Sequence, residues 1–448
     1  MNSNFHNKKI VIIGSGFRAM MTAFYCLKKS SDVTLLSNTE NIHGVMSPIK
    51  WLGGNFDKGY HFFDGLNGYN KKILEDFVGT ESLNDFGYGA ASYTNKKIYP
   101  NHGIPYWPHK SIFFSLNSLI QYIFSIFKKN KKNILSYKDL LDTLPSNISK
   151  VLQEACYRNT NMSAEKLSHL VSRYSHFLCY RQTILPDFLS NVLKKINFFD
   201  SRIAARRRSL NLEEISLYPK GKYIGYIANI MEEKLKKLGL KFIVSKENKI
   251  LNDGKDMSIN FDGKIIKPDF TFIVTELDDA LNLFKEKITE KKNNHFVSQI
   301  LYYFATDNLY SNYQYVHGND TNIHINRATN LSLYGEKTDT NKYVISAEIP
   351  TKTDSEIWKN SDEFKDTIWK ELKLMGMAGK EQNYTNYKIF NIEKTLSVPL
   401  IDFDNSLNKF NNLLEFKYQN KIFLPGIGTF TRNIFMESLN SIFENEKK

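Results

Sequence analysis

A glycine-rich turn between a short apolar strand and a helix is the feature that most constrains this chain. Residues 9–13 (KIVII) are almost entirely apolar, as expected for a strand buried in a parallel sheet. The next six residues, Gly14-Ser15-Gly16-Phe17-Arg18-Ala19, fit the pattern G-x-G-x-x-A. Residues 17–29 are predicted to form a helix, and residues 32–36 (DVTLL) a second strand. Strand, glycine turn, helix and strand within about thirty residues predict one βαβ unit.

The positions of this turn suit a dinucleotide site. Gly14 allows the tight turn, Gly16 lets the backbone approach a pyrophosphate, and Ala19 is small enough for close packing of helix on strand. The N–H groups at the helix N-terminus supply donors for the anion. A glycine turn without a ligand is the alternative. We predict that the turn contacts a dinucleotide through Gly14, Ser15, Gly16, Phe17 and Arg18.

The residue that closes the second strand departs from the usual pattern. An acidic residue there usually holds the ribose hydroxyls of a dinucleotide. This chain has Ser37 at that position, and Glu40 follows three residues later. Either Ser37 makes a weaker ribose contact or Glu40 substitutes for the missing acid.

Two further motifs follow the turn along the chain. Gly44 and then Phe56-Asp57-Lys58-Gly59-Tyr60-His61-Phe62-Phe63 come first, and Gly426-Ile427-Gly428-Thr429-Phe430 precedes the last helix. In this order, the three motifs resemble the FAD-dependent superfamily that contains UDP-galactopyranose mutase, protoporphyrinogen oxidase and the amine oxidases. The resemblance implies that the second motif lies over the flavin. It also implies that the last helix points its positive N-terminal end at the flavin pyrimidine ring, stabilising the anionic reduced form.

The resemblance therefore implies FAD as the cofactor. The residues that it places at the cofactor are Gly44, His61, Gly426, Gly428 and Thr429. His61 is either a polar group beside the flavin or a histidine satisfied within the core, and we favour the first because flavin reduction needs adjustable hydrogen bonds. Asp57 is predicted to be structural, accepting hydrogen bonds from backbone N–H groups.

Two arginines are candidates for binding an anionic substrate. Arg206, followed by the turn at residues 218–223 (YPKGKY), is similar to a stretch of the sugar mutase that helps to bind the substrate pyrophosphate. Arg327, in IHINRATNLS, falls where the superfamily places an arginine close to the flavin. Arginine suits phosphate because its planar fork binds two oxygens and stays charged. The alternatives are an exposed basic run for Arg206 and a strand-surface charge for Arg327. With His61, these arginines are the predicted catalytic residues.

Several observations bound the partners. The net charge is +13, but the 60 Lys and Arg residues are scattered, so we expect an anionic small-molecule substrate and no nucleic acid. The three cysteines lack metal-ligand spacing, and no metal site is predicted. Neither a signal region nor a bilayer-spanning run is present, which predicts a cytoplasmic protein. The apolar segment 111–127, flanked by lysines, predicts a helix over the substrate cavity or a peripheral membrane contact. The oligomeric state stays open.

The expected fold class is α/β, with a Rossmann-like FAD-binding sheet, an antiparallel-sheet substrate lobe and a helical cap. Residues 96–108 and 257–275 are each expected to form a hairpin, and the second arm of the latter, residues 270–274 (FTFIV), resembles a strand that returns into the nucleotide-binding sheet. The FAD-binding domain is assigned to residues 1–95, 216–285 and 416–448, the helical cap and part of the substrate lobe to 96–215, and the antiparallel sheet to 286–415.

The expected function is a flavoenzyme that exchanges hydride between FAD and a small organic substrate, such as an anionic or nucleotide-linked sugar of glycan biosynthesis. A redox-neutral sugar mutase that uses reduced FAD is one alternative. A degenerate flavin-fold binding protein is another, and Ser37 in place of an acid favours it.

Overall fold

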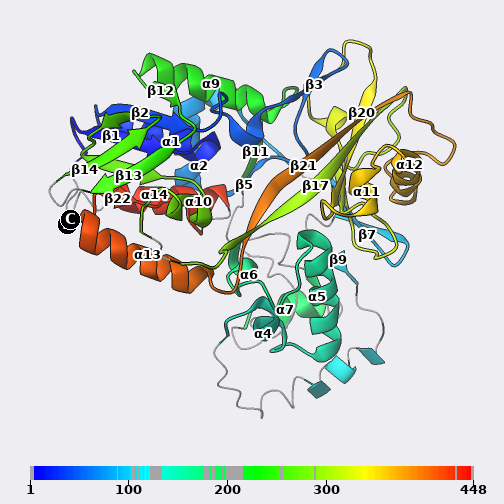
Figure 1. Ribbon diagram of the computed structural model, residues 1–448. Coiled ribbons are helices and arrows are strands. Elements are labelled where there is room, and N and C mark those ends of the chain that lie inside the picture. The colour runs from blue at the N-terminus through cyan, green and yellow to red at the C-terminus, as the bar shows by residue number, and fades with distance from the viewer. Residues whose placement is uncertain are drawn as a thin grey trace.

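The protein is described by a computed structural model over most of its 448 residues. The described residues are 5–87, 89–101, 106–108, 134–174, 187–193, 215–252, 256–286, 289–428 and 431–444, with 111, 113–114, 116–118, 120–121, 181–182 and 195–196. Figure 1 shows a parallel sheet with helices, a long-stranded second sheet beside it, and a group of helices below.

A five-stranded parallel sheet confirms the predicted βαβ unit. Its order is β12 (Lys241–Val244), β2 (Asp32–Ser37), β1 (Lys9–Ile13), β16 (Phe270–Ile273) and β22 (Ile422–Phe423). All four strand pairs are parallel. Because β1 precedes the first glycine turn and β22 precedes the last one, the sheet brings these two motifs to the same edge.

The two faces of this sheet have different covers, and side-chain alternation along β1 shows both. Ile10 and Ile12 belong to the core cluster with the helices α1 (Gly16–Lys28), α2 (Gly68–Val78), α9 (Ile224–Lys237) and α14 (Arg432–Glu444). Val11 and Ile13 belong to the cluster on the other face. There the antiparallel strands β13 (Asn248–Asn252), β14 (Met257–Phe261) and β15 (Lys264–Ile266) pack with α10 (Leu277–Leu281) and α13 (Phe403–Tyr418). The domain is thus three-layered.

A seven-stranded sheet forms the second lobe. Its order is β21 (Asn386–Pro399), β17 (Asn294–Thr306), β20 (Tyr343–Pro350), β19 (Arg327–Asn330), β18 (Tyr315–Gly318), β7 (Ala90–Thr94) and β8 (Lys97–Pro100). Every pair is antiparallel except β18 with β7, which is parallel. The predicted antiparallel lobe is therefore a mixed sheet, because β7 arrives from the N-terminal part of the chain. The helices α11 (Glu356–Lys359) and α12 (Lys365–Leu374) pack on one face.

The first predicted hairpin is wrong; the second has the wrong bounds, but the strand predicted at 270–274 joins the parallel sheet as expected. Residues 96–108 do not form a hairpin, since β8 pairs back to β7 through Asn95 and Lys96, whose φ angles are 52° and 59°. Beyond it, β9 (Tyr106–Trp107) pairs with β10 (Arg181–Gln182). The hairpin within 257–275 closes between β14 and β15 at Asp262 and Gly263, while β16 leaves it for the parallel sheet. Two-residue turns with positive φ close both hairpins, at Asn95-Lys96 and at Asp262-Gly263; the first turn is poorly marked in the sequence because it contains no glycine.

The helical group includes α4 (Tyr137–Leu141), α5 (Ser146–Thr160), α6 (Val171–Tyr174) and α7 (Asp187–Leu193). It has its own core cluster, which includes Leu152 and Cys156 and reaches Val297 and Val398 of the large sheet. The remaining short strands are β3 (Ile49–Trp51), β4 (Gly54–Phe56), β5 (Phe63–Leu66), β6 (Asn84–Asp85) and β11 (Ile215–Tyr218). No helix in the described part of the chain is long and apolar enough to cross a membrane.

Candidate dinucleotide and substrate site

The glycine turn places two glycines in left-handed backbone conformations with different surroundings. Gly14 has a φ of 139°, and a Cβ atom there would lie 2.8 Å from Cγ2 of Val274, so packing of β1 against β16 requires this glycine. Gly16 has a φ of 75°, and a Cβ atom there would meet nothing described closer than the carbonyl oxygen of His43, at 3.7 Å. The turn is therefore crowded at Gly14, whereas a Cβ atom at Gly16 would make only ordinary contacts with the described residues.

The start of α1 suits an anionic ligand. Ser15 precedes the helix in an extended conformation, and its side chain makes no capping hydrogen bond. The first turn of α1, described in full, contains no acidic residue. Gly44, with a φ of 59°, supports the turn so closely that a Cβ atom there would lie 3.1 Å from Cα of Gly16. Helix N–H groups that no side chain caps, next to a glycine without a side chain, form a ready anion site.

Residues from the middle and the end of the chain pack against the glycine turn and the start of α1. The side chain of Arg18 forms an ion pair with Glu276, Nη1 to Oε1 at 3.1 Å. A Cβ atom at Gly426 would lie 3.2 Å from Cα of Val274 and 3.3 Å from Cδ of Arg18. Gly428 has a φ of 76° and lies near Phe403. Thr429 lies outside the described residues.

The end of β2 carries no acidic side chain positioned to bind the ribose. Ser37 is buried, and its Oγ lies 3.1 Å from both the backbone nitrogen and Oγ1 of Thr39. Glu40 is exposed. The hydroxyl of Ser37 is thus engaged in a local turn, and its ribose contact stays a prediction.

Asp57 confirms its predicted structural role. Its Oδ1 accepts a hydrogen bond from the backbone nitrogen of Ile224, the first residue of α9, at 2.7 Å. Its Oδ2 accepts one from Oη of Tyr218, also at 2.7 Å. Burial raises the pKa of Asp57 to about 7, against the lowering effects of these two hydrogen bonds and of the nearby Arg432. The carboxyl group fixes the start of the 57–63 segment to the helix layer.

His61 is half-buried and neutral at physiological pH. Burial lowers the pKa of His61 to about 4, and the charge of Arg432 acts in the same direction. Glu348 opposes this shift. A neutral imidazole keeps one donor and one acceptor nitrogen for hydrogen bonds.

Arg327 is buried in an ion pair, so the alternative of a strand-surface charge is wrong. Its Nε and Nη2 donate to the two carboxylate oxygens of Glu348, at 2.8 and 2.6 Å. Glu348 also accepts from the backbone nitrogen of Tyr60 at 3.0 Å and from Nε2 of Gln299 at 2.9 Å. The guanidinium lies over the Tyr60 ring, 4.7 Å from its centroid. The arginine fork thus ties the large sheet to the 57–63 segment, and its predicted contact with substrate phosphate stays a prediction.

Three residues near the site were not predicted from the sequence: Glu348, Gln299 and Arg432. Glu348 and Gln299 join Arg327 only through the register of β17, β19 and β20. Arg432, the first residue of α14, donates to the carbonyl oxygen of Phe62. A charged residue in the alternating strand YVISAEIP was the one signal for Glu348. Arg206 lies outside the described residues.

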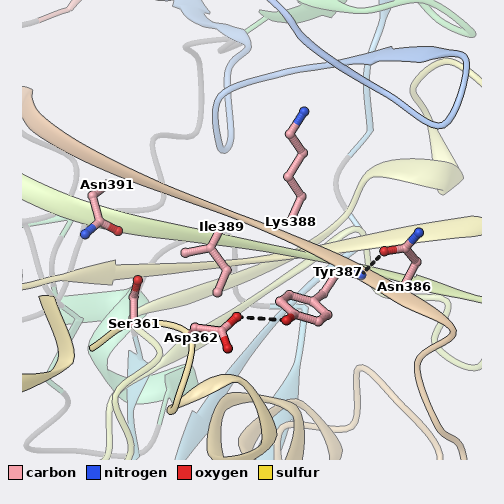
Figure 2. A pocket seen from close by; sticks show the side chains of 7 residues that line it. All are labelled: Ser361, Asp362, Asn386, Tyr387, Lys388, Ile389 and Asn391. Atoms are coloured by element: carbon pink, nitrogen blue, oxygen red, sulfur yellow. Dashed lines mark hydrogen bonds between the residues drawn. The ribbon is translucent and has the colours of Figure 1, made fainter. Parts of the chain in front are cut away.

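A groove of about 600 Å³ lies elsewhere, beside β21 and the loop between α11 and α12. In Figure 2 the Tyr387 ring points towards Asp362, with Oη to Oδ1 at 2.8 Å, and Lys388 points to the other side of the strand. Its other lining residues are Ser361, Asn386, Ile389 and Asn391. None of the predicted site residues lines this groove, so it is separate from the glycine turn.

A parallel sheet whose first strand enters a helix through an open glycine turn defines a Rossmann-type dinucleotide-binding fold. The whole chain is similar to a reduced UDP-galactopyranose mutase, with 14% identity, a TM-score of 0.70, and coverage of 98% of this chain and 93% of that one. It is also similar to a putative protoporphyrinogen oxidase from Exiguobacterium sp. 255-15, with 13% identity, a TM-score of 0.66 and coverage of 98% and 99%. A putrescine oxidase matches with 9% identity, a TM-score of 0.61 and coverage of 98% and 99%.

No protein-family model and no curated protein sequence matches the chain. At identities this low the likeness shows the fold. It is the fold that the order of the three glycine motifs predicted.

Proposed function

We propose that this protein is an FAD-dependent enzyme whose glycine turn holds the cofactor pyrophosphate. The observation that carries the proposal is the backbone at Gly16, where a Cβ atom would clash with no described atom, together with the close support by Gly44 and the uncapped start of α1. The resemblance of residues 56–63 and 426–430 to FAD-dependent enzymes supports FAD as the dinucleotide. Gly14, Ser15, Phe17 and Arg18 would complete the turn around it.

Bound FAD would supply hydride acceptance and donation. The chain would position the cofactor and a small organic substrate. Ser37 would contact the ribose end, and Gly426, Gly428 and Thr429 the other end. His61 would offer hydrogen bonds without adding charge, because its imidazole is neutral. Arg327 and Arg206 would favour an anionic substrate.

The purified protein tests this proposal directly. We expect a yellow protein with near-stoichiometric FAD, or an apoprotein that regains flavin absorbance on reconstitution. Anaerobic bleaching by candidate sugars, amines and acids would identify the reductant. A folded protein that binds no FAD would refute the proposal and support the reading as a degenerate binding protein.

A redox-neutral sugar mutase is the second candidate. Its support is the fold likeness to UDP-galactopyranose mutase over 98% of this chain, together with the position of Arg327. Its test is incubation of the prereduced protein with UDP-galactopyranose or UDP-galactofuranose, followed by chromatography. Isomerisation without net flavin oxidation would establish the mutase. Net sugar oxidation coupled to flavin reduction would establish the oxidoreductase instead.

We further propose that the apolar segment 111–127, together with α7 of the helical group, contacts a membrane surface. Three apolar side chains at helical spacing are exposed: Phe113 at 79%, Leu116 at 50% and Ile120 at 49%. On α7, Phe188 and Val192 are exposed at 68% and 56%. Lysines flank the first group in the sequence, as in helices that lie on anionic lipid.

Co-sedimentation with vesicles that contain phosphatidylserine tests the membrane contact. The double variant Phe113→Ser/Phe188→Ser should bind less than the wild type. Phe416→Ser is the matched control, because Phe416 is 85% exposed on α13, outside the helical group. Equal sedimentation of the two variants, or no binding by the wild type, would refute the contact.

A further inference from the structure

Arg432 links the three segments that carry the predicted motifs. It opens α14, whose first turn is capped by Thr431, with the backbone nitrogen of Ile434 3.2 Å from Oγ1 of Thr431. Its guanidinium carbon lies 5.6 Å from the centroid of the Phe17 ring and 4.9 Å from that of Phe63. It also donates to the carbonyl oxygen of Phe62. One cation therefore contacts the turn after Gly16, the 57–63 segment and the terminal helix.

The described part of the chain provides no close counter-ion for this cation. Among the described residues, no carboxylate lies within ion-pair distance of Arg432. Asp64 and Asp57 act on it only from farther away, and Asp57 is already bound to Tyr218 and α9. Burial lowers the pKa of Arg432, and the charge of Arg18 lowers it further.

The position at a helix N-terminus adds to the imbalance. The macrodipole places positive charge there, which favours anions and disfavours an arginine in the first turn. Two aromatic rings and one carbonyl group compensate part of the cost of removing the guanidinium from water. A partly buried cation in a positive field is stabilised when an anion binds beside it.

We infer that Arg432 provides the positive charge that compensates an anionic group of the bound dinucleotide. This inference rests on the proposed function, because the dinucleotide enters at Gly16, next to Phe17. Two sources of negative charge belong to that ligand: the pyrophosphate and the reduced flavin. Arg18 differs from Arg432 because Glu276 already neutralises it.

The test uses Arg432→Gln and Arg432→Lys in the full chain, with FAD as the probe. The readouts are the FAD dissociation constant of the apoprotein at low and high salt, the midpoint potential of the bound flavin, and the thermal midpoint of the apoprotein. Arg158→Gln is the matched control, since Arg158 also donates to backbone carbonyl groups, those of Asp320 and Ile325, but lies on α5.

We expect Arg432→Gln to weaken FAD binding about tenfold or to lower the midpoint potential, because a charge-assisted interaction is lost. Weaker, less salt-dependent binding at an unchanged potential would assign the charge to the pyrophosphate. A lower potential with near-normal binding would assign it to the reduced flavin. Arg432→Lys should retain part of either effect, and it replaces the Gln variant if that one does not fold.

Unchanged affinity and potential in Arg432→Gln, with a normal apoprotein melt, would overturn the inference and make the arginine purely structural. The same loss in Arg158→Gln would overturn it as well. A wild-type protein that binds no FAD would instead remove the proposed function, so the two failures are distinguishable.

Discussion

Replacing Gly16 by alanine distinguishes an effect on FAD binding from an effect on the stability of the fold. The φ angle of Gly16 is 75°, and an L-residue in this left-handed region costs about 1–2 kcal/mol. The new methyl group would make only ordinary contacts within the described protein, the nearest at 3.7 Å to the carbonyl oxygen of His43. The free energy of unfolding should therefore fall by about 1–2 kcal/mol, without a cavity or a clash.

The loss of FAD binding free energy should exceed the loss of unfolding free energy. The methyl group would enter the space through which the backbone approaches the pyrophosphate. Losing one hydrogen bond to a charged group costs roughly 1.5–3 kcal/mol. This corresponds to an increase of about ten- to a hundredfold in the dissociation constant of FAD.

Gly263→Ala is the matched control for this variant. Gly263 lies in the turn between β14 and β15 with a φ of 82°, and no described atom lies within 4 Å of a Cβ atom placed there. It should show the same loss in urea unfolding, with normal FAD affinity measured by flavin fluorescence quenching. Equal FAD affinity in the two alanine variants would refute the placement of the pyrophosphate at Gly16.

Three other predictions concern buried charges. Arg327→Met should lower the free energy of unfolding by roughly 3–5 kcal/mol, because Glu348 is left unpaired. Adding Glu348→Met should restore much of this loss in urea titrations. If the effects of the two single variants simply add in the double variant, the coupling is refuted. The pKa of Asp57 is raised from 3.8 to about 7, so its contribution to the free energy of unfolding is complete below pH 3.8 and is lost as the pH rises to about 7. Asp57→Asn should remove this pH dependence from unfolding free energies measured between pH 4 and 8. The lowered pKa of His61, from 6.5 to about 4, acts in the opposite direction: stability from this group is complete above pH 6.5 and is lost as the pH falls to about 4, so His61→Gln should flatten the acid limb of the same measurement.

The parts of the fold that the sequence predicted well depend on short-range patterns. The strands at 9–13 and 32–36 and the helix between them follow from an apolar run, a glycine turn and helical spacing. The bounds of the first hairpin were wrong because its turn, Asn95-Lys96, adopts positive φ angles without a glycine to mark it. Prolines further along the chain suggested a later turn.

The candidate site depends on contacts that no local pattern encodes. Arg327 was found, but its partner Glu348 stands opposite it only because of the β19–β20 register. Arg432 and Phe62 are 370 residues apart and meet because α14 packs beside β5. Such pairs follow from the order of elements in three dimensions, which one sequence does not determine.

The three glycines of the cofactor turn are not equivalent, and the difference bears on whether this fold still holds a ligand. Gly14 is required by Val274, 2.8 Å from a Cβ atom placed there, and Gly44 by Gly16, at 3.1 Å. Both would be needed in a protein that bound nothing. A Cβ atom at Gly16 would make only ordinary contacts, at 3.7 Å to the carbonyl oxygen of His43 and 3.8 Å to Cα of Gly44, and asparagine can adopt its left-handed φ at modest cost. Packing therefore explains Gly14 and Gly44. At Gly16 only the left-handed φ favours glycine, and a ligand that approaches the backbone would add a reason for the missing side chain that a degenerate binding protein would lack.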